Sequence, residues 1–466
     1  MSEGVSHELP PEESWWRPAQ RREIALVGVA AAAGISALAL AARASRARKQ
    51  RRSPLRSDLW NSSIDLDGRI TGIQRVLDKA RQRGVEPALK PSLWPFLLQL
   101  YSASSTASER VQKRSVLETH LRQLLRRCEK LDVDLRRLGG SDQGAVLAAA
   151  GAKGEYASSR STCMQFEEAQ RVIVLDVVRM DMAAMERAEK QIRGGEVVSA
   201  GDGGTSAESR NICVWTGRMA EEALRDAPHL NAYARHTARR LISLLSAYAV
   251  YDPEIGYCQG MSDLAAPFVA VLADDVEAFW CFESLMQTAR RDFGDGGEGM
   301  GMRLRTLART LEHHDPVLVH KLYLSGAADC LFAYRMVLVR MRRELSLDKC
   351  LLLWEVIWAE ELAGSLGFGP RWRMLLKDHA TTIAEFNLSA LERERRTVPD
   401  LLTCFIADVI RCQRRPLLAS VRETDDVARV FSAYDIDLWK SLNEARRLQT
   451  AMAGKIAVLK QASKKS

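Results

Sequence analysis

Hydrophobic positions along most of the chain recur every three or four residues, which is the spacing of one face of an α-helix. One such stripe comprises Leu241, Leu244, Leu245 and Tyr248. Similar patterns predict helices over residues 89–98, 109–136, 276–286, 331–343, 351–358 and 401–410. Two-residue alternation bounded by hairpin turns, which would indicate strands, is scarce. The pattern therefore predicts an all-α body.

Residues 24–42 form a different pattern, because they contain no charged side chain. This stretch approaches the roughly 20 apolar residues that cross a bilayer, and Trp15 and Trp16 precede it as interfacial aromatics would. Three interpretations compete: a signal anchor, a cleaved signal peptide, and an alanine-rich helix that is buried or lies on a surface. Export would place free cysteines in an oxidising space. We therefore expect a membrane anchor that leaves the body in the cytoplasm, on the cytosolic face of an endomembrane.

The composition predicts three segments. An N-terminal segment, residues 1–66, holds the candidate anchor and a basic flank; a helical body covers residues 67–445; and a basic tail covers residues 446–466. Glycine-rich stretches near residues 139–160 and 194–210 are typical of surface insertions. Neither has the spacing of a phosphate-binding loop. The chain is therefore not expected to hold a nucleotide by itself.

Charge and cysteine spacing exclude two other classes of function. The formal net charge of +8 is concentrated between Arg43 and Arg56, without the interleaved aromatics of a nucleic-acid site. The nine cysteines contain no C-x-x-C pair, so we expect reduced thiols and no zinc site. His313 and His314 are adjacent and would point in different directions on a helix. We expect no metal, no cofactor and no nucleic-acid partner.

The first candidate for chemistry is the stretch of residues 173–179, in which Asp176 precedes Arg179 by three positions. On a helix this spacing places both side chains on one face, so the carboxylate can orient the guanidinium. Arginine is always charged and presents a planar fork of donors to phosphate oxygens. The alternative is an ordinary surface ion pair, worth about 0–1 kcal/mol.

The second candidate is Gln259, which follows an Asp-Pro turn and lies between Gly256 and Gly260. Ser262 and Asp263 resemble the start of a helix before the apolar run at residues 264–272. A carboxamide both donates and accepts hydrogen bonds, so it can orient a water molecule; the alternative is a turn glutamine that caps a backbone group. An arginine and a glutamine without a nucleophile suit the stabilisation of charge on a transferring phosphoryl group.

These two motifs resemble those of Rab GTPase-activating proteins with a TBC domain. That family carries R-x-x-x-W, I-x-x-D-x-x-R and Y-x-Q in this order. Ile173, Asp176 and Arg179 match the second motif, and Tyr257 and Gln259 match the third. The similarity covers roughly residues 84–362, with weaker family-like helices to about residue 445.

The first motif departs from the family, because Lys90 stands where the family has arginine, four residues before Trp94. Lysine keeps the charge but loses the two-pronged donor geometry. Met180 also replaces the threonine that usually follows the arginine of the second motif.

The resemblance implies an all-helical, V-shaped domain that supplies two residues in trans to a GTP-bound Rab and so regulates vesicle trafficking. Arg179 would neutralise charge on the γ-phosphate, and Gln259 would position the hydrolytic water. The support residues would be Asp176, Tyr257, Ile173, Trp94 and Lys90. Mg²⁺ would arrive with the nucleotide of the Rab. Two rival hypotheses are a TBC-like module that binds a GTPase or scaffold without accelerating hydrolysis, and a membrane tether carried by residues 1–60.

Overall fold

The chain divides into two compact units, Met1–Ser53 and Pro54–Ser466. The computed structural model describes residues 53–139, 153–193, 212–213, 215–294, 297–368, 398–431 and 434–462. The candidate anchor at residues 24–42 and the glycine-rich stretch at 194–210 lie outside these ranges. Within them, no helix is both long and apolar enough to cross a membrane.

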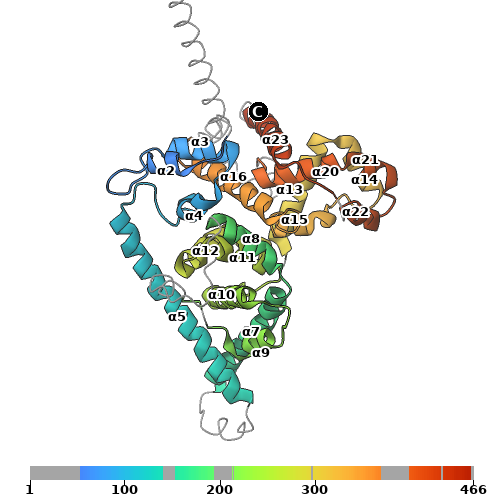
Figure 1. Cartoon of the computed structure of the whole chain (residues 1–466). Helices are drawn as coiled ribbons and strands as arrows, with labels where there is room; N and C mark the ends of the chain where they lie inside the picture. The colour runs from blue at the N-terminus through green and yellow to red at the C-terminus, as the bar shows by residue number, and fades with distance from the viewer. Residues whose placement is uncertain are drawn as a thin grey trace, which may run out of the picture. The chain divides into compact units, whose positions relative to one another are not determined.

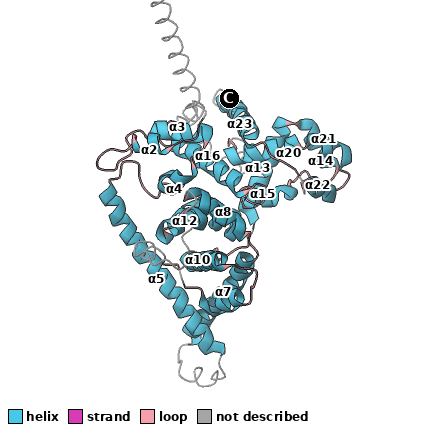
Figure 2. Cartoon of the chain, viewed as in Figure 1, coloured by secondary structure: helices cyan, strands magenta, loops and turns pink. Residues whose placement is uncertain are grey.

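The described residues are helical, with short connections between the helices (Figures 1 and 2). Their only β-type pairings are isolated bridges between Leu55 and Val85 and between Ile64 and Ile70. The predicted all-α fold is therefore confirmed. In chain order the helices are α2 (Ser57–Asn61), α3 (Ile73–Arg83), η2 (Pro87–Leu89), α4 (Lys90–Leu97), α5 (Ala107–Gly139), α7 (Lys153–Val178), α8 (Met182–Ile192), α9 (Gly217–Arg225), α10 (Ala232–Tyr251), α11 (Met261–Val271), α12 (Asp275–Phe293), α13 (Glu298–His314), α14 (Pro316–Leu324), η5 (Leu331–Ala333), α15 (Tyr334–Leu338), α16 (Leu347–Ser365), α20 (Leu401–Cys412), α21 (Arg414–Ser420), α22 (Thr424–Val430) and α23 (Leu438–Ala462).

Helix α11 lies at the centre of the core, since every one of its residues is buried. A buried arginine joins it to its neighbours: Arg240 on α10 pairs with Asp275 on α12 at 2.7 Å between Nε and Oδ1. The same guanidinium donates to the carbonyl oxygens of Val269 and Leu272, at 3.1 and 2.8 Å. A buried charge is costly unless it is paired and hydrogen-bonded. These bonds therefore fix α10 and α11, which flank the loop that carries Gln259.

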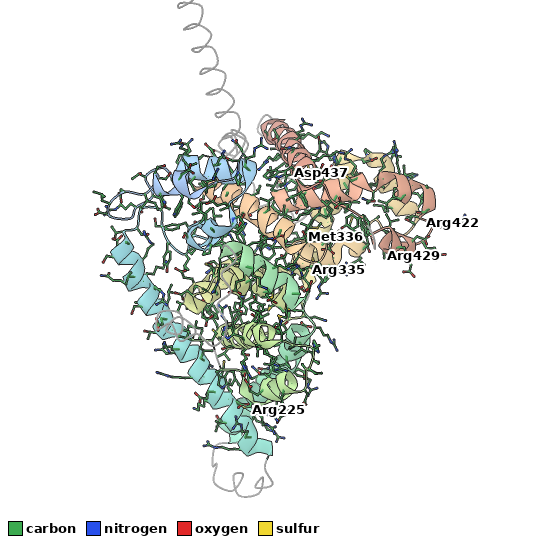
Figure 3. The ribbon with its side chains drawn as sticks, viewed as in Figure 1. Arg225, Arg335, Met336, Arg422, Arg429 and Asp437 are labelled. Atoms are coloured by element: carbon green, nitrogen blue, oxygen red, sulfur yellow. The ribbon has the colours of Figure 1, made fainter. Side chains whose placement is uncertain are left out.

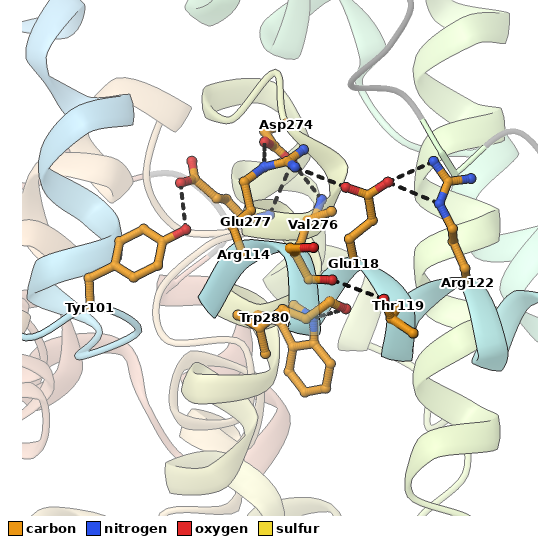
Figure 4. Close-up of polar contacts among 11 residues, drawn as sticks. Tyr101, Arg114, Glu118, Thr119, Arg122, Asp274, Val276, Glu277 and Trp280 are labelled. Carbon is orange, nitrogen blue, oxygen red and sulfur yellow. Dashed lines mark hydrogen bonds and ion pairs between the residues drawn. The ribbon is translucent and has the colours of Figure 1, made fainter. Parts of the chain in front are cut away.

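The long helix α5 is attached to α12 by polar contacts along one side (Figure 4). Arg114 on α5 donates to Asp274, the N-cap of α12, at 2.6 Å. The indole of Trp280 donates to the carbonyl oxygen of Leu117 at 3.1 Å. Ahead of α5 in the chain, the Tyr101 hydroxyl donates to Glu277 at 3.0 Å. These contacts fix the start of α12 against α5.

Two predicted segment boundaries and one predicted helix differ from the structure. The predicted N-terminal segment ends at residue 66, but residues 54–66 belong to the packed unit, where Leu55 and Trp60 are buried. Helix α23 runs through the boundary predicted at residue 445, because Leu448 and Ile456 continue its buried face. The single helix predicted over residues 331–343 is wrong: it is a 3₁₀ turn and a short helix that ends at Leu338, followed by a series of turns.

Candidate functional site

The C-terminal end of α7 positions Arg179. Ile173 and Val177, one helical turn apart, are fully buried and fix the last turns of α7 against the core. The helix ends at Val178, so Arg179 is the first residue beyond it and is exposed. The partial negative charge at a helix C-terminus favours a cation at this position. Asp181 then begins α8 by accepting a hydrogen bond from the Ala184 amide at 3.0 Å.

The predicted pairing of Asp176 with Arg179 is absent, since no ion pair or hydrogen bond joins the two side chains. The physical reason is the end of α7: Arg179 has left the helical spiral and does not share the face of Asp176. No described residue pairs with the guanidinium of Arg179. Its donors are therefore available to another molecule.

Gln259 lies on the loop between α10 and α11, where two glycines set the backbone. Gly256 and Gly260 have φ angles of 62° and 101°, in the left-handed region that favours glycine. Gly260 is the N-cap of α11, and the amide of Met261 donates to the carbonyl oxygen of Cys258 at 3.1 Å. The Gln259 side chain is exposed and makes no hydrogen bond to a described residue. The alternative that it caps a backbone group is thereby excluded for the described residues.

A single hydrogen bond joins the two motifs. The hydroxyl of Tyr257, two residues before Gln259, donates to Oδ2 of Asp176, three residues before Arg179, at 2.7 Å. Burial and the neighbouring Asp176 charge raise the pKa of the Tyr257 phenol well above its ordinary value, so it stays protonated and remains a donor at neutral pH. Segments 81 residues apart in sequence are thus joined beside both candidate side chains.

The first motif lies at the contact between α4 and α16. Lys90 Nζ pairs with Glu355 Oε1 at 2.5 Å, and the buried Trp94 indole donates to the same oxygen at 2.8 Å. The other oxygen of Glu355 is buried without a hydrogen-bond partner, and burial raises the pKa of this carboxyl against the lowering effect of Lys90. Lys90 and Trp94 therefore contact Glu355 and neither Arg179 nor Gln259, so any support they give is indirect.

Sequence reasoning missed a basic residue next to this site. Arg343, in the turns after α15, pairs with Asp263 in the first turn of α11 at 2.7 Å. Its only sequence signal is its place in a basic run. Within the described ranges, no group of three or more His, Cys, Asp or Glu side chains could hold a metal. What the site offers is a cation and a carboxamide exposed on a fixed scaffold, suited to a negatively charged ligand on a docked molecule.

The chain is similar to known proteins over the part that contains this site. A model of the Rab-GTPase-TBC domain matches residues 222–368, which include Tyr257 and Gln259. Rab GTPase-activating protein 22 of Arabidopsis thaliana is 27% identical over 491 residues, covering 89% of this chain and 83% of that protein. The chain is therefore similar to Rab GTPase-activating proteins and carries a match to their TBC domain.

Other relatives align over a smaller share of their own length. TBC1 domain family member 25 of Homo sapiens is 27% identical over 66% of this chain and 34% of its own length. The GTPase-activating protein GYP7 of Saccharomyces cerevisiae is 26% identical over 66% of this chain and 38% of its own length. The crystal structure of the Ypt/Rab-GAP domain of Gyp1p shares the fold, with a TM-score of 0.53 at 14% identity, covering 86% of this chain and 98% of that one.

Proposed function

We propose that the chain accelerates GTP hydrolysis on a Rab-type small GTPase by supplying Arg179 and Gln259 in trans. The observation that carries this proposal is the Tyr257–Asp176 hydrogen bond of 2.7 Å. It joins the segments that bear the two exposed side chains, neither of which has a partner among the described residues. The match to the Rab-GTPase-TBC domain and the similarity to Rab GTPase-activating protein 22 support the same function.

Each residue has a defined task in this proposal. The Arg179 guanidinium binds the γ-phosphate oxygens as charge moves onto them, and a residue of this kind contributes roughly 10³–10⁵ in rate. The Gln259 carboxamide oxygen accepts a hydrogen bond from the hydrolytic water and orients it for in-line attack. The protonated Tyr257 holds Asp176, which fixes the spacing of the two segments. Mg²⁺ belongs to the nucleotide of the GTPase, so the chain contributes no metal.

The test is single-turnover GTP hydrolysis on a panel of purified, GTP-loaded Rab proteins, with the full chain in excess. Arg179→Ala should lower the acceleration by roughly 10³-fold or more, and Gln259→Ala should lower it by roughly 10²-fold or more. Arg171→Ala and Gln165→Ala are matched controls, because both residues are exposed on α7 and should leave the rate unchanged. Full activity in both Arg179→Ala and Gln259→Ala would refute the assignment of these two residues.

The rival binding module predicts a different outcome of the same experiment. It would bind a GTP-loaded Rab without accelerating hydrolysis, and Arg179→Ala would leave the affinity almost unchanged. Measuring binding to a Rab that holds a non-hydrolysable GTP analogue separates affinity from rate. Binding without acceleration by the folded wild-type chain, across a broad panel, would replace the activator proposal with this one.

We also propose that residues 24–42 anchor the protein on the cytosolic face of an endomembrane, where it regulates vesicle trafficking. The support is the uncharged stretch and the basic flank that follows it. Deleting residues 1–53, which form the first unit, should release the protein from membranes and leave its rate on a soluble GTPase unchanged. Unaltered membrane recovery of the truncated chain would exclude the anchor. Loss of activity together with localisation would instead assign the function to these residues.

A further inference from the structure

The turn between α15 and α16 has an unusual backbone. Arg340 and Met341 have φ angles of 48° and 64°, so two consecutive non-glycine residues are left-handed. Each such residue costs on the order of 1–2 kcal/mol. Strain of this kind persists only where the surroundings hold the backbone in place. The contacts of this turn show what holds it.

Three neighbouring helices hold the turn. The buried side chain of Arg340 donates to the Thr288 hydroxyl on α12 at 2.7 Å. The carbonyl oxygen of Arg340 accepts a hydrogen bond from the Trp354 indole on α16 at 2.9 Å. The Met341 amide donates at 2.9 Å to the carbonyl oxygen of Met336 on α15. Figure 3 labels Met336. The turn is therefore a rigid support, and its remaining side chains have fixed positions.

This support lies against the loop that carries Gln259. Val339 packs so closely on Gly260 that a Cβ atom there would lie 3.1 Å from its Cγ1 atom. Four residues later, Arg343 donates from Nε to Oδ2 of Asp263 at 2.8 Å, and its Nη2 forms an ion pair with the same oxygen at 2.7 Å. Asp263 follows the loop directly, and its amide donates to the carbonyl oxygen of Gly260 at 3.1 Å. The segment thus contacts the end of the Gln259 loop through apolar side chains, and the first turn of α11 through an ion pair.

We propose that Arg343 is a positioning residue, which holds Gln259 in its working place through Asp263. This inference rests on the proposed function. The Asp263 side chain is only 12% exposed, so it requires a counter-charge. Arg343 supplies that charge from a turn that cannot easily move. It thereby fixes the first turn of α11 and the loop immediately before it.

Arg343 also interacts electrostatically with Asp176, in the motif that carries Arg179. Its pKa is raised first by the hydrogen bond to Asp263 and further by the charge of Asp176. The guanidinium is therefore stabilised mainly by the carboxylate that follows Gln259 and also by the charge that precedes Arg179. Its bonded partner is Asp263, not the nucleotide.

Hydrogen–deuterium exchange on the full chain tests the positioning without any GTPase. Arg343→Gln should increase exchange at the amides of residues 257–264 by about tenfold or more. Arg414→Gln is the matched control: Arg414 is 43% exposed and pairs at 2.6 Å with Asp315, the N-cap of α14, whereas Arg343 is 45% exposed. The control should leave residues 257–264 unchanged. Equal exchange in wild type and Arg343→Gln would overturn the inference.

A double-mutant cycle tests whether Arg343 acts through Gln259. On a GTPase that the wild-type chain accelerates, Arg343→Gln should lower kcat by about 10–100-fold and change KM much less. Arg343→Lys, which keeps the charge but has a single donor nitrogen, should recover part of this loss. In the Gln259→Ala background, Arg343→Gln should cause little further loss.

The outcomes of this cycle separate the two proposals. An undiminished effect of Arg343→Gln in the Gln259→Ala background would overturn the positioning role and indicate direct contact with the GTPase. If the wild-type chain accelerates no GTPase, the proposed function fails, and the exchange measurement still decides whether Arg343 holds the loop. If the wild-type chain is active and Arg343→Gln has full kcat, only the positioning inference fails.

Discussion

Removing the hydroxyl oxygen of Tyr257 tests whether the motifs that carry Arg179 and Gln259 depend on the hydrogen bond between them. Tyr257→Phe deletes the hydroxyl that donates to Asp176 at 2.7 Å and keeps the ring that packs against the core. The substitution leaves Arg179 and Gln259 chemically intact. Any loss of activity then reports their positions and not their chemistry.

The structure sets the size of the expected effects. A hydrogen bond to a charged group contributes about 1.5–3 kcal/mol, but Asp176 is only partly buried and water can replace part of the bond. We therefore expect the free energy of unfolding to fall by about 1–2 kcal/mol. A displacement of about 1 Å between catalytic groups costs roughly 10²-fold in rate. The acceleration should accordingly fall by about 10–100-fold, less than the loss expected for Arg179→Ala.

The assay pairs urea denaturation with single-turnover GTP hydrolysis on the same full-length samples. Tyr101→Phe is the matched control, because the Tyr101 hydroxyl donates to Glu277 at 3.0 Å and takes no part in the site. The control should lose a similar amount of stability and keep the full rate. If Tyr257→Phe also keeps the full rate while losing stability, the bond serves folding alone and our reasoning about the joined motifs is wrong.

Lys90→Arg should raise the free energy of unfolding in urea by about 1 kcal/mol, because a guanidinium offers a second donor to the unpaired Glu355 oxygen; no gain would mean that this oxygen is already satisfied. Gly260→Ala should cost about 2 kcal/mol or more, since its left-handed backbone leaves the new methyl group 3.1 Å from Val339. Gly256→Ala, which is left-handed but has open space, should cost only about 1 kcal/mol, and equal costs would contradict the contact. Burial raises the pKa of Glu355 above its unfolded-state value, so the folded state binds this proton more tightly and stability falls as pH rises from the ordinary carboxyl range through the raised pKa. Glu355→Gln should remove that part of the fall when unfolding is compared across pH, and an identical pH profile would refute the shift.

Local patterns in the sequence predict most individual helices. The run predicted at residues 401–410 becomes α20 (Leu401–Cys412), and the segment predicted at 89–98 becomes η2 and α4. The prediction fails over residues 331–343, where apolar spacing suggested one helix. There the backbone turns left-handed at Arg340 because Thr288 and Trp354, distant in sequence, hold it. Helical periodicity contains no information about such contacts.

The sequence by itself determined the all-α class and the two motifs that carry Arg179 and Gln259, because helical periodicity and motif spacing are properties of neighbouring residues. Only the tertiary structure decided which side chains form hydrogen bonds and ion pairs with one another. Asp176 binds Tyr257 across 81 positions instead of Arg179 three positions away, because α7 ends before the arginine. Arg343 reaches Asp263 across 80 positions for a similar reason, since the turn that carries it is held by other helices. Ion pairs and hydrogen bonds depend on distance in space, and packing, which no local pattern contains, sets that distance.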